Sequence, residues 1–153
     1  MENLSIVYYE SLFYAMNVSK IGKISNIAKP VLLLAILELI EKKYISENKI
    51  YYTTELKEEY NYIYREYKKD SIVTPMCYPY YYLKTEPFYI LNGQTNRKTP
   101  SDKFIVENIK YAEFDGDLWS LLQVKENREK IKTIIKNLIK QYNLILWQQN
   151  IVK

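Results

Sequence analysis

Ala28-Lys29-Pro30-Val31-Leu32-Leu33-Leu34-Ala35-Ile36-Leu37 is the stretch that decides the fold of this chain. A proline is tolerated only in the first turn of a helix, so Pro30 predicts a helix that begins near Ile27 and runs to about Lys43. Charged residues follow from Glu38 onward, far short of the roughly 20 apolar residues that a membrane span needs. We therefore predict a helix in the centre of a hydrophobic core.

Further helices are predicted from candidate caps and from apolar residues at helical spacing. Their expected ranges are residues 4–16, a segment from Thr53 or Thr54 to about Lys69, a segment from Ser101-Asp102 to Lys110, a short segment over 118–122 behind Asp115 or Asp117, and a last segment from Asn127 onward. Ser25 or Asn26 is the candidate cap of the central helix, residues 20–23 read as a loop, and residues 50–52 as a short strand. In the last helix the apolar side chains should face inward and the cations outward: Arg128, Lys132, Lys136 and Lys140.

Tyr78-Pro79-Tyr80-Tyr81-Tyr82-Leu83 is a second unusual stretch. Residues 76–83 and 87–91 are both β-prone, and the three residues between them give the spacing of a hairpin or wing closed by Asn92-Gly93. We predict an α+β fold, mainly α-helical, with about five or six helices and a small antiparallel hairpin or wing. Residues 1–153 should form a single domain, in which residues 144–153 are an apolar C-terminal tail and a candidate partner contact.

The composition excludes several kinds of catalysis. The chain has no histidine, which removes the general base of serine and cysteine triads and the usual zinc ligand. Three glycines could scarcely form a phosphate-binding loop, and Asp115-Gly116-Asp117 lacks the further oxygens of a calcium loop. The Glu-x-Lys triplets of residues 41–57 lie ahead of the first aspartate, Asp70, so a carboxylate-only nuclease is disfavoured. We expect neither enzymatic activity nor a cofactor.

The expected compartment is the cytoplasm. Glu2 stands where a secretory signal would carry basic residues, and the single Cys77 excludes an internal disulfide. The 22 Lys+Arg and 18 Asp+Glu residues give a net charge of +4, which permits nucleic-acid binding without requiring it. The 17 tyrosines fit base stacking and an A+T-rich coding bias equally well. No membrane association is predicted.

The order of the segments resembles the N-terminal sulfur-binding domain of modification-dependent HNH restriction endonucleases. The likeness rests on the Lys29-Pro30 leucine-rich helix, the Tyr78-Pro79 aromatic run with Phe88 and Tyr89 after it, and the stretch from Ser101 to Glu129, and it covers roughly residues 4–142. That domain reads phosphorothioate DNA, in which sulfur replaces a non-bridging phosphate oxygen. The resemblance implies a module that binds modified duplex DNA and leaves cleavage to a separate nuclease or effector, because the histidine-dependent nuclease has no counterpart here.

The resemblance also implies where the ligand lies. Lys29 and Pro30 match the basic residue and proline that help hold the modified phosphate, and Tyr78 and Pro79 match the pair that forms the apolar sulfur pocket. Tyr82 stands where characterised readers have a smaller residue and Ala28 where they have a polar one, which predicts weaker or altered selectivity. Candidate contacts to the DNA backbone are cations outside the main helices: Lys20, Lys23, Lys84, Arg97 and Lys98.

Other roles for these residues stay open at this point. Tyr78-Pro79 could be a turn that packs under the hairpin, Lys29 could shield a helix end, and at least one of residues 80–82 must serve the core. Two other functions fit the same sequence. One is a protein interaction or regulatory module that keeps the fold but has lost sulfur binding, and the other is a reader of base-modified DNA, since aromatic clusters also stack extruded bases.

Overall fold

The fold is mainly helical. The computed structural model describes the backbone of residues 4–21, 24–69 and 71–152 and the side chains of residues 5–20, 25–69 and 71–143. Within these ranges the helices are α1 (Leu4–Tyr14), α2 (Ala28–Glu41), α3 (Thr54–Tyr67), α4 (Cys77–Tyr82), α5 (Asp102–Asn108), α6 (Gly116–Gln123) and α7 (Lys125–Val152), and a 3-10 turn, η1 (Leu83–Thr85), follows α4. The strands are β1 (Lys20–Ile21), β2 (Ile24–Ser25), β3 (Tyr89–Gly93) and β4 (Ile109–Phe114). The predicted class, α+β and mainly helical, is confirmed.

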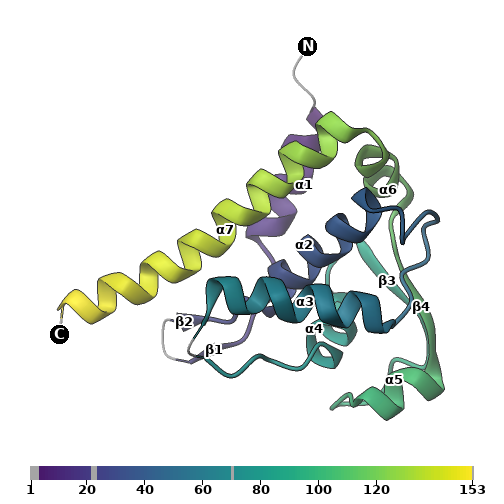
Figure 1. The fold of residues 1–153 in the computed structure, drawn as a ribbon, viewed down its shortest axis with the longest axis horizontal. Coiled ribbons are helices and arrows are strands. Elements are labelled where there is room, and N and C mark those ends of the chain that lie inside the picture. Colours follow the sequence, from purple (N-terminus) through teal and green to yellow (C-terminus); the bar gives the residue numbers. More distant parts are fainter. Residues whose placement is uncertain (1–3, 22–23, 70, 153) are drawn as a thin grey trace.

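The central position predicted for α2 is confirmed. It lies between α7 and the β3–β4 pair, with α3 crossing it (Figure 1), and all of its residues from Ala28 to Ile40 except Glu38 are buried. The N-cap position is Ile27 and not the predicted Ser25 or Asn26, and it makes no side-chain cap hydrogen bond. The side chain of Asn26, the residue before it, nevertheless accepts the N–H of Ala28 at 2.7 Å through its Oδ1. Pro30 occupies the first turn, where it interrupts no helical hydrogen bond.

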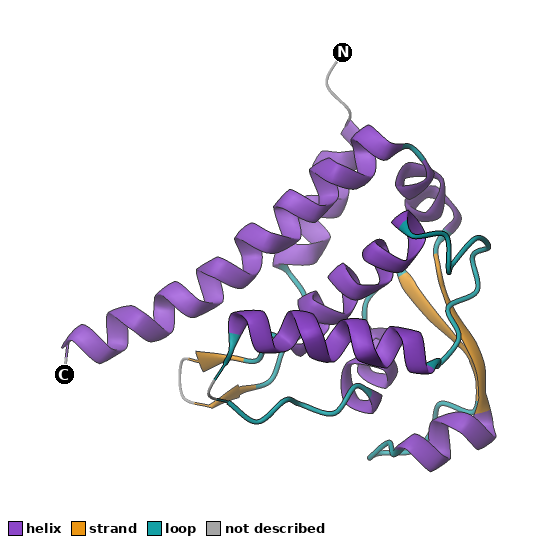
Figure 2. Ribbon diagram, in the orientation of Figure 1, coloured by secondary structure: helices purple, strands orange, loops and turns teal. Residues whose placement is uncertain are grey.

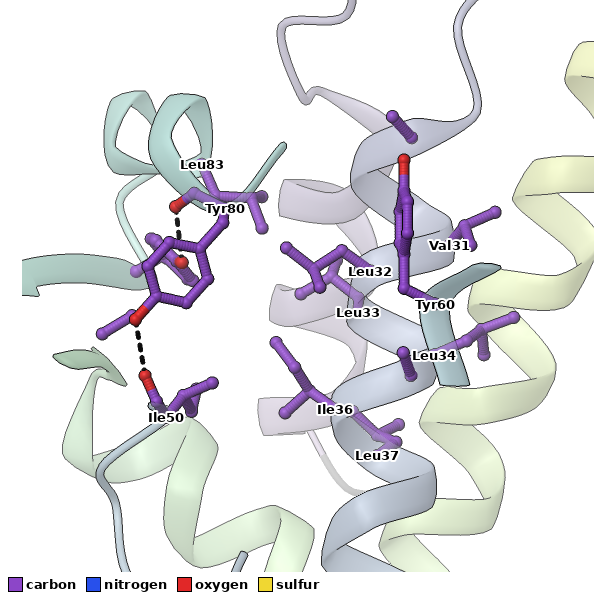
Figure 3. Packing of buried hydrophobic residues seen from close by; sticks show 14 of the residues in the cluster. Val31, Leu32, Leu33, Leu34, Ile36, Leu37, Ile50, Tyr60, Tyr80 and Leu83 are labelled. Carbon is purple, nitrogen blue, oxygen red and sulfur yellow. Dashed lines mark hydrogen bonds between the residues drawn. The ribbon is translucent and has the colours of Figure 1, made fainter. Parts of the chain in front are cut away.

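The strand predicted over residues 76–83 is wrong, because Cys77–Tyr82 forms helix α4. Pro79 is the third residue of this helix, a position whose N–H has no partner within a helix, so the proline that seemed to mark an edge strand fits a helical first turn instead. Tyr80 then points into the core, where its hydroxyl donates to the carbonyl of Ile50 at 2.7 Å. Figure 3 shows Leu32 of α2 on the side that faces the Tyr80 ring. Core packing thus overrides the β-propensity of the tyrosines.

The small antiparallel pair is built from other segments than predicted. β3 pairs with β4, Tyr89 opposite Phe114, and not with residues 76–83. Gly93, expected to close a hairpin, lies at a register shift with φ of 146°. Residues 50–52 contribute only an isolated bridge, from Ile50 to Ala112. β1 and β2 form a second short antiparallel pair, so residues 20–21 of the predicted loop lie in a strand, and the two pairs lie far apart in Figure 2.

Local sequence signals elsewhere predicted the helix starts correctly. Thr53 caps α3, Ser101 caps α5 and Asp115 caps α6, each by accepting the N–H three residues on. α7 differs from its prediction on one face. Arg128 is buried and pairs with Glu41, and Lys132 pairs with Glu38, so the two cations expected to face solvent attach α7 to α2. Lys136 and Lys140 are exposed, as predicted.

The far end of α7 extends past the rest of the fold (Figure 1). The predicted apolar tail falls on these last turns, and its side chains, including Trp147, lie outside the described residues. In the part of the chain that the structure describes, no helix is both long and apolar enough to cross a bilayer.

Candidate functional site

A pocket of about 270 Å³ opens beside the N-terminal end of α2. Two segments about fifty residues apart meet there, because α4 packs against α2. Lys29, Tyr78, Pro79 and Tyr82, four of the five ligand residues that the resemblance implies, line this one pocket. The remaining lining residues are Asn17, Val18, Ser19, Asn26, Ala28, Thr74 and Thr85. Pro30 is buried and is not part of the lining.

Two tyrosines form an aromatic wall. Tyr78 and Tyr82 lie one turn apart on α4, with ring planes 15° from parallel and centroids 6.5 Å apart. The hydroxyl of Tyr82 donates to the carbonyl of Lys98, which holds the ring at the pocket edge. The pocket is open with the Tyr82 ring as part of its lining. Pro79, which is buried, adds a further apolar surface to the lining.

Lys29 does not offer a free cation to the pocket. Its side chain is buried, and its Nζ donates to Oε2 of Glu86 at 2.8 Å and to the carbonyl of Asn17. The Lys29 and Glu86 side chains are 10% and 5% exposed, so this is a buried ion pair. At short range the positive charge of Lys29 is balanced before any ligand arrives.

The cations expected to contact a DNA backbone have different environments. Lys84 is occupied within the fold, because its Nζ donates to the carbonyl of Thr95 at 2.8 Å and lies 4.7 Å from the centroid of the Tyr81 ring. Arg97 and Lys98 are exposed on the loop beside Tyr82. Lys20 is exposed on β1, and Lys23 lies outside the described residues.

A more polar hollow of about 300 Å³ adjoins the pocket, with which it shares Ser19, Asn26 and Thr74. Thr74 lies where the two meet. Its Oγ1 accepts Nδ2 of Asn26 at 3.1 Å, and its carbonyl accepts the hydroxyl of Tyr60 at 2.6 Å. Lys68 and Ser71 also line this hollow but not the first pocket. An apolar pocket and a more polar hollow therefore lie next to each other, with three lining residues in common.

Several residues of this site were not predicted from the sequence. Asn17 and Thr74 are polar residues of connecting segments, and nothing in their local pattern sets them apart. Asn26 was expected as a helix cap and not as a residue of a pocket. Glu86 had a detectable signal: it is the one carboxylate in the stretch 76–91, which is otherwise aromatic and apolar except for Lys84 and Thr85. A lone acidic residue in such a stretch indicates a buried charge with a partner, because an unpaired one would be costly.

The described side chains form no metal-binding cluster. No group of three or more His, Cys, Asp and Glu side chains among them could hold a metal ion. Burial raises the pKa of the Cys77 thiol above its usual value, which keeps it in the less reactive protonated form. What the pocket offers is an apolar surface over a balanced ion pair, an arrangement suited to binding.

Compared with models of known protein families and with curated protein sequences, the chain matches none of either.

Proposed function

We propose that this chain is a DNA-binding module that recognises phosphorothioate-modified duplex DNA and has no catalytic activity of its own. The observation that supports this function is the meeting of Lys29, Tyr78 and Pro79 in one pocket, together with Tyr82. The family resemblance implies these residues as the sulfur site, and they come from segments that are far apart in the sequence.

The pocket chemistry suits sulfur better than oxygen. Sulfur in place of a non-bridging oxygen is larger, softer and less strongly hydrated, so moving it onto the Pro79 ring and the aromatic wall costs little desolvation. A phosphate oxygen placed against the Pro79 ring and the aromatic wall would lose its water and gain no hydrogen bond from those two surfaces. The preference for the sulfur-modified duplex would then come mainly from the desolvation cost of placing a phosphate oxygen in the pocket.

The charge of the DNA backbone needs partners at the rim of the pocket, since Lys29 is already paired. The exposed Arg97 and Lys98 lie on the loop whose Lys98 carbonyl accepts the Tyr82 hydroxyl. Lys68 lines the adjoining hollow, and Lys20 is exposed next to Ser19, which lines both hollows. The first turn of α2 also lies at the pocket, where helix dipoles favour negative charge. Phosphate contacts of this kind give affinity and a marked salt dependence but carry no sequence information.

The test is binding of the purified chain to one duplex made with and without a single stereodefined Rp phosphorothioate, measured by fluorescence anisotropy at several salt concentrations. We expect a preference for the sulfur duplex, and we expect Pro79→Ala and Tyr78→Ala to reduce it about tenfold, equivalent to about 1.4 kcal/mol. Tyr44→Ala is the matched control, because Tyr44 is an exposed tyrosine just beyond the opposite end of α2. Equal affinity for the two duplexes at every salt concentration would disprove the proposal.

The buried ion pair favours a second candidate, a protein interaction module that keeps the fold. A pocket whose cation is already neutralised also suits an apolar side chain of a protein partner. For self-association, sedimentation velocity over a hundredfold concentration range is the measurement. A monomer at all concentrations, unchanged when residues 144–153 are deleted, would exclude that form of the second candidate.

A further inference from the structure

The ion pair beneath the pocket differs from the other ion pairs of the described residues. Both of its side chains are almost fully buried, whereas Arg128–Glu41 and Lys132–Glu38 each leave the carboxylate about 30% exposed. Its partners lie 57 positions apart in the sequence. Burying two charges has a high desolvation cost, and replacement of such a pair by apolar residues is often neutral or stabilising. A role in ligand binding at the pocket would explain why the Lys29–Glu86 ion pair is present despite this cost.

Glu86 occupies a preformed anion site. A single oxygen, Oε2, accepts Nζ of Lys29 at 2.8 Å and the backbone N–H of Asn17 at 3.0 Å, and the hydroxyl oxygen of Thr85 lies 3.1 Å away. Lys29, Asn17 and Thr85 all line the pocket, while Glu86 lies behind them. The carboxylate of the chain itself therefore takes the hydrogen bonds that an anionic ligand would otherwise receive.

We infer that Glu86 is the residue that sets the selectivity of the pocket, by neutralising Lys29 so that an unmodified phosphate gains no compensating charge on entry. This inference rests on the proposed function. An oxygen-bearing phosphate loses hydration in the pocket and finds its cation already paired, whereas sulfur loses much less hydration. If Lys29 were unpaired, its charge would attract both forms of the backbone, and the difference between them would shrink.

The decisive variant is Glu86→Gln. The amide oxygen of glutamine can accept the same hydrogen bonds as Oε2, so the pocket keeps its shape while Lys29 gains an unbalanced charge. We expect affinity to rise for both duplexes and more for the unmodified one, which lowers the preference for sulfur about tenfold. The log–log salt dependence should steepen by about one, as for one added phosphate contact.

A double variant separates charge balance from structure. Lys29→Met together with Glu86→Gln removes both charges, so the pocket is again neutral. We expect this variant to lose the raised affinity for the unmodified duplex and the steeper salt dependence that Glu86→Gln shows. Glu41→Gln is the control for net charge, because it removes one carboxylate from an ion pair on the α2–α7 contact, away from the pocket. Thermal unfolding of every variant identifies any that fails to fold. If Glu86→Gln does not fold, comparison of the double variant with the wild-type chain still tests the inference.

The outcomes are distinguishable. If the wild-type chain shows no preference for sulfur, the proposed function fails and this inference fails with it. If the wild-type prefers sulfur but Glu86→Gln keeps the same preference, only the role of Glu86 is overturned. A double variant that folds but binds the unmodified duplex more tightly than the wild-type chain does would overturn it as well.

Discussion

At the scale of single residues, the ion pair with Glu86 explains how the positive charge of Lys29 is tolerated at the N-terminal end of α2. Lys29 lies in the first turn of α2, where helix dipoles disfavour a cation. The carboxylate of Glu86, 2.8 Å from the lysine Nζ, brings a negative charge to the same helix end. The local mismatch at residue 29 is thus compensated by a residue of another segment.

The same geometry predicts how strongly each partner depends on the other. Lys29→Met should lower the free energy of unfolding by about 3–5 kcal/mol, because it leaves the Glu86 carboxylate buried without a counter-charge. Lys29→Met with Glu86→Gln should be considerably more stable than Lys29→Met alone. Urea denaturation of the two single variants and the double variant measures the coupling. Additive effects of the two substitutions would show that the pair contributes no coupling to the fold.

At the scale of elements, helix starts were predictable because their signals are local. The caps at Thr53, Ser101 and Asp115 follow from a side-chain oxygen next to an apolar pattern, and all three are present. Helix α4 was not predictable in this way. Its tyrosines favour strands in isolation, and its helical form depends on contacts with distant segments, such as the bond from Tyr80 to Ile50.

Alanine should have opposite effects on stability at two glycines, Gly93 at the end of β3 and Gly116 at the start of α6. Gly93 has φ of 146°, and a Cβ there would lie 2.1 Å from the backbone oxygen of Asn108. Gly93→Ala should therefore destabilise the β3–β4 pair by more than about 3 kcal/mol. Gly116, at the start of α6, has open space around the same position, so Gly116→Ala should stabilise the protein by about 0.5–1 kcal/mol. Thermal and urea unfolding would test both, and equal effects would contradict this assignment of strain.

At the scale of the whole molecule, the buried tyrosines fill the core and also bind backbone carbonyls within it. Figure 3 shows Tyr60 and Tyr80 in the cluster around α2. Both hydroxyls donate to backbone carbonyls, as does that of the buried Tyr89, which reaches the carbonyl of Tyr80 at 2.6 Å. The abundance of tyrosine therefore has a structural use at these positions, where the composition alone left coding bias and base stacking open.

These three tyrosines predict a loss of stability at high pH. Burial raises the pKa of Tyr60, Tyr80 and Tyr89 above the usual value of about 10. Their contribution is complete below pH 10 and is lost above it, because the unfolded chain releases phenolic protons that the folded chain retains. Each should cost about 1.4 kcal/mol per pH unit in that range. We expect the phenolate absorbance of these three tyrosines to appear together with loss of the circular dichroism signal, and their ionisation without unfolding would contradict this.

The fold class was predictable from the sequence, whereas the completed site was only partly so. A central apolar helix with a proline in its first turn and capped helices around it indicate a mainly helical protein without any long-range information. The meeting of Lys29 with Tyr78 and Pro79 required a family resemblance, because periodicity does not say which segments touch. The pairing of Lys29 with Glu86 depends on the packing of α4 and η1 against α2, and no local pattern encodes it.

Helix α4 is also joined to the loop that carries Arg97 and Lys98. Tyr81 donates to the carbonyl of Arg97 at 2.7 Å, and Tyr82, its neighbour, donates to the carbonyl of Lys98. Two consecutive hydroxyls thus bind two consecutive carbonyls. These bonds hold the loop of residues 97–98 at a fixed distance from the pocket wall on α4. If the pocket takes a backbone sulfur, the cations can meet neighbouring phosphates only at that spacing. The helical form of the nucleic acid would then be a second criterion of recognition, so that the same sulfur in an A-form hybrid duplex would be held less well.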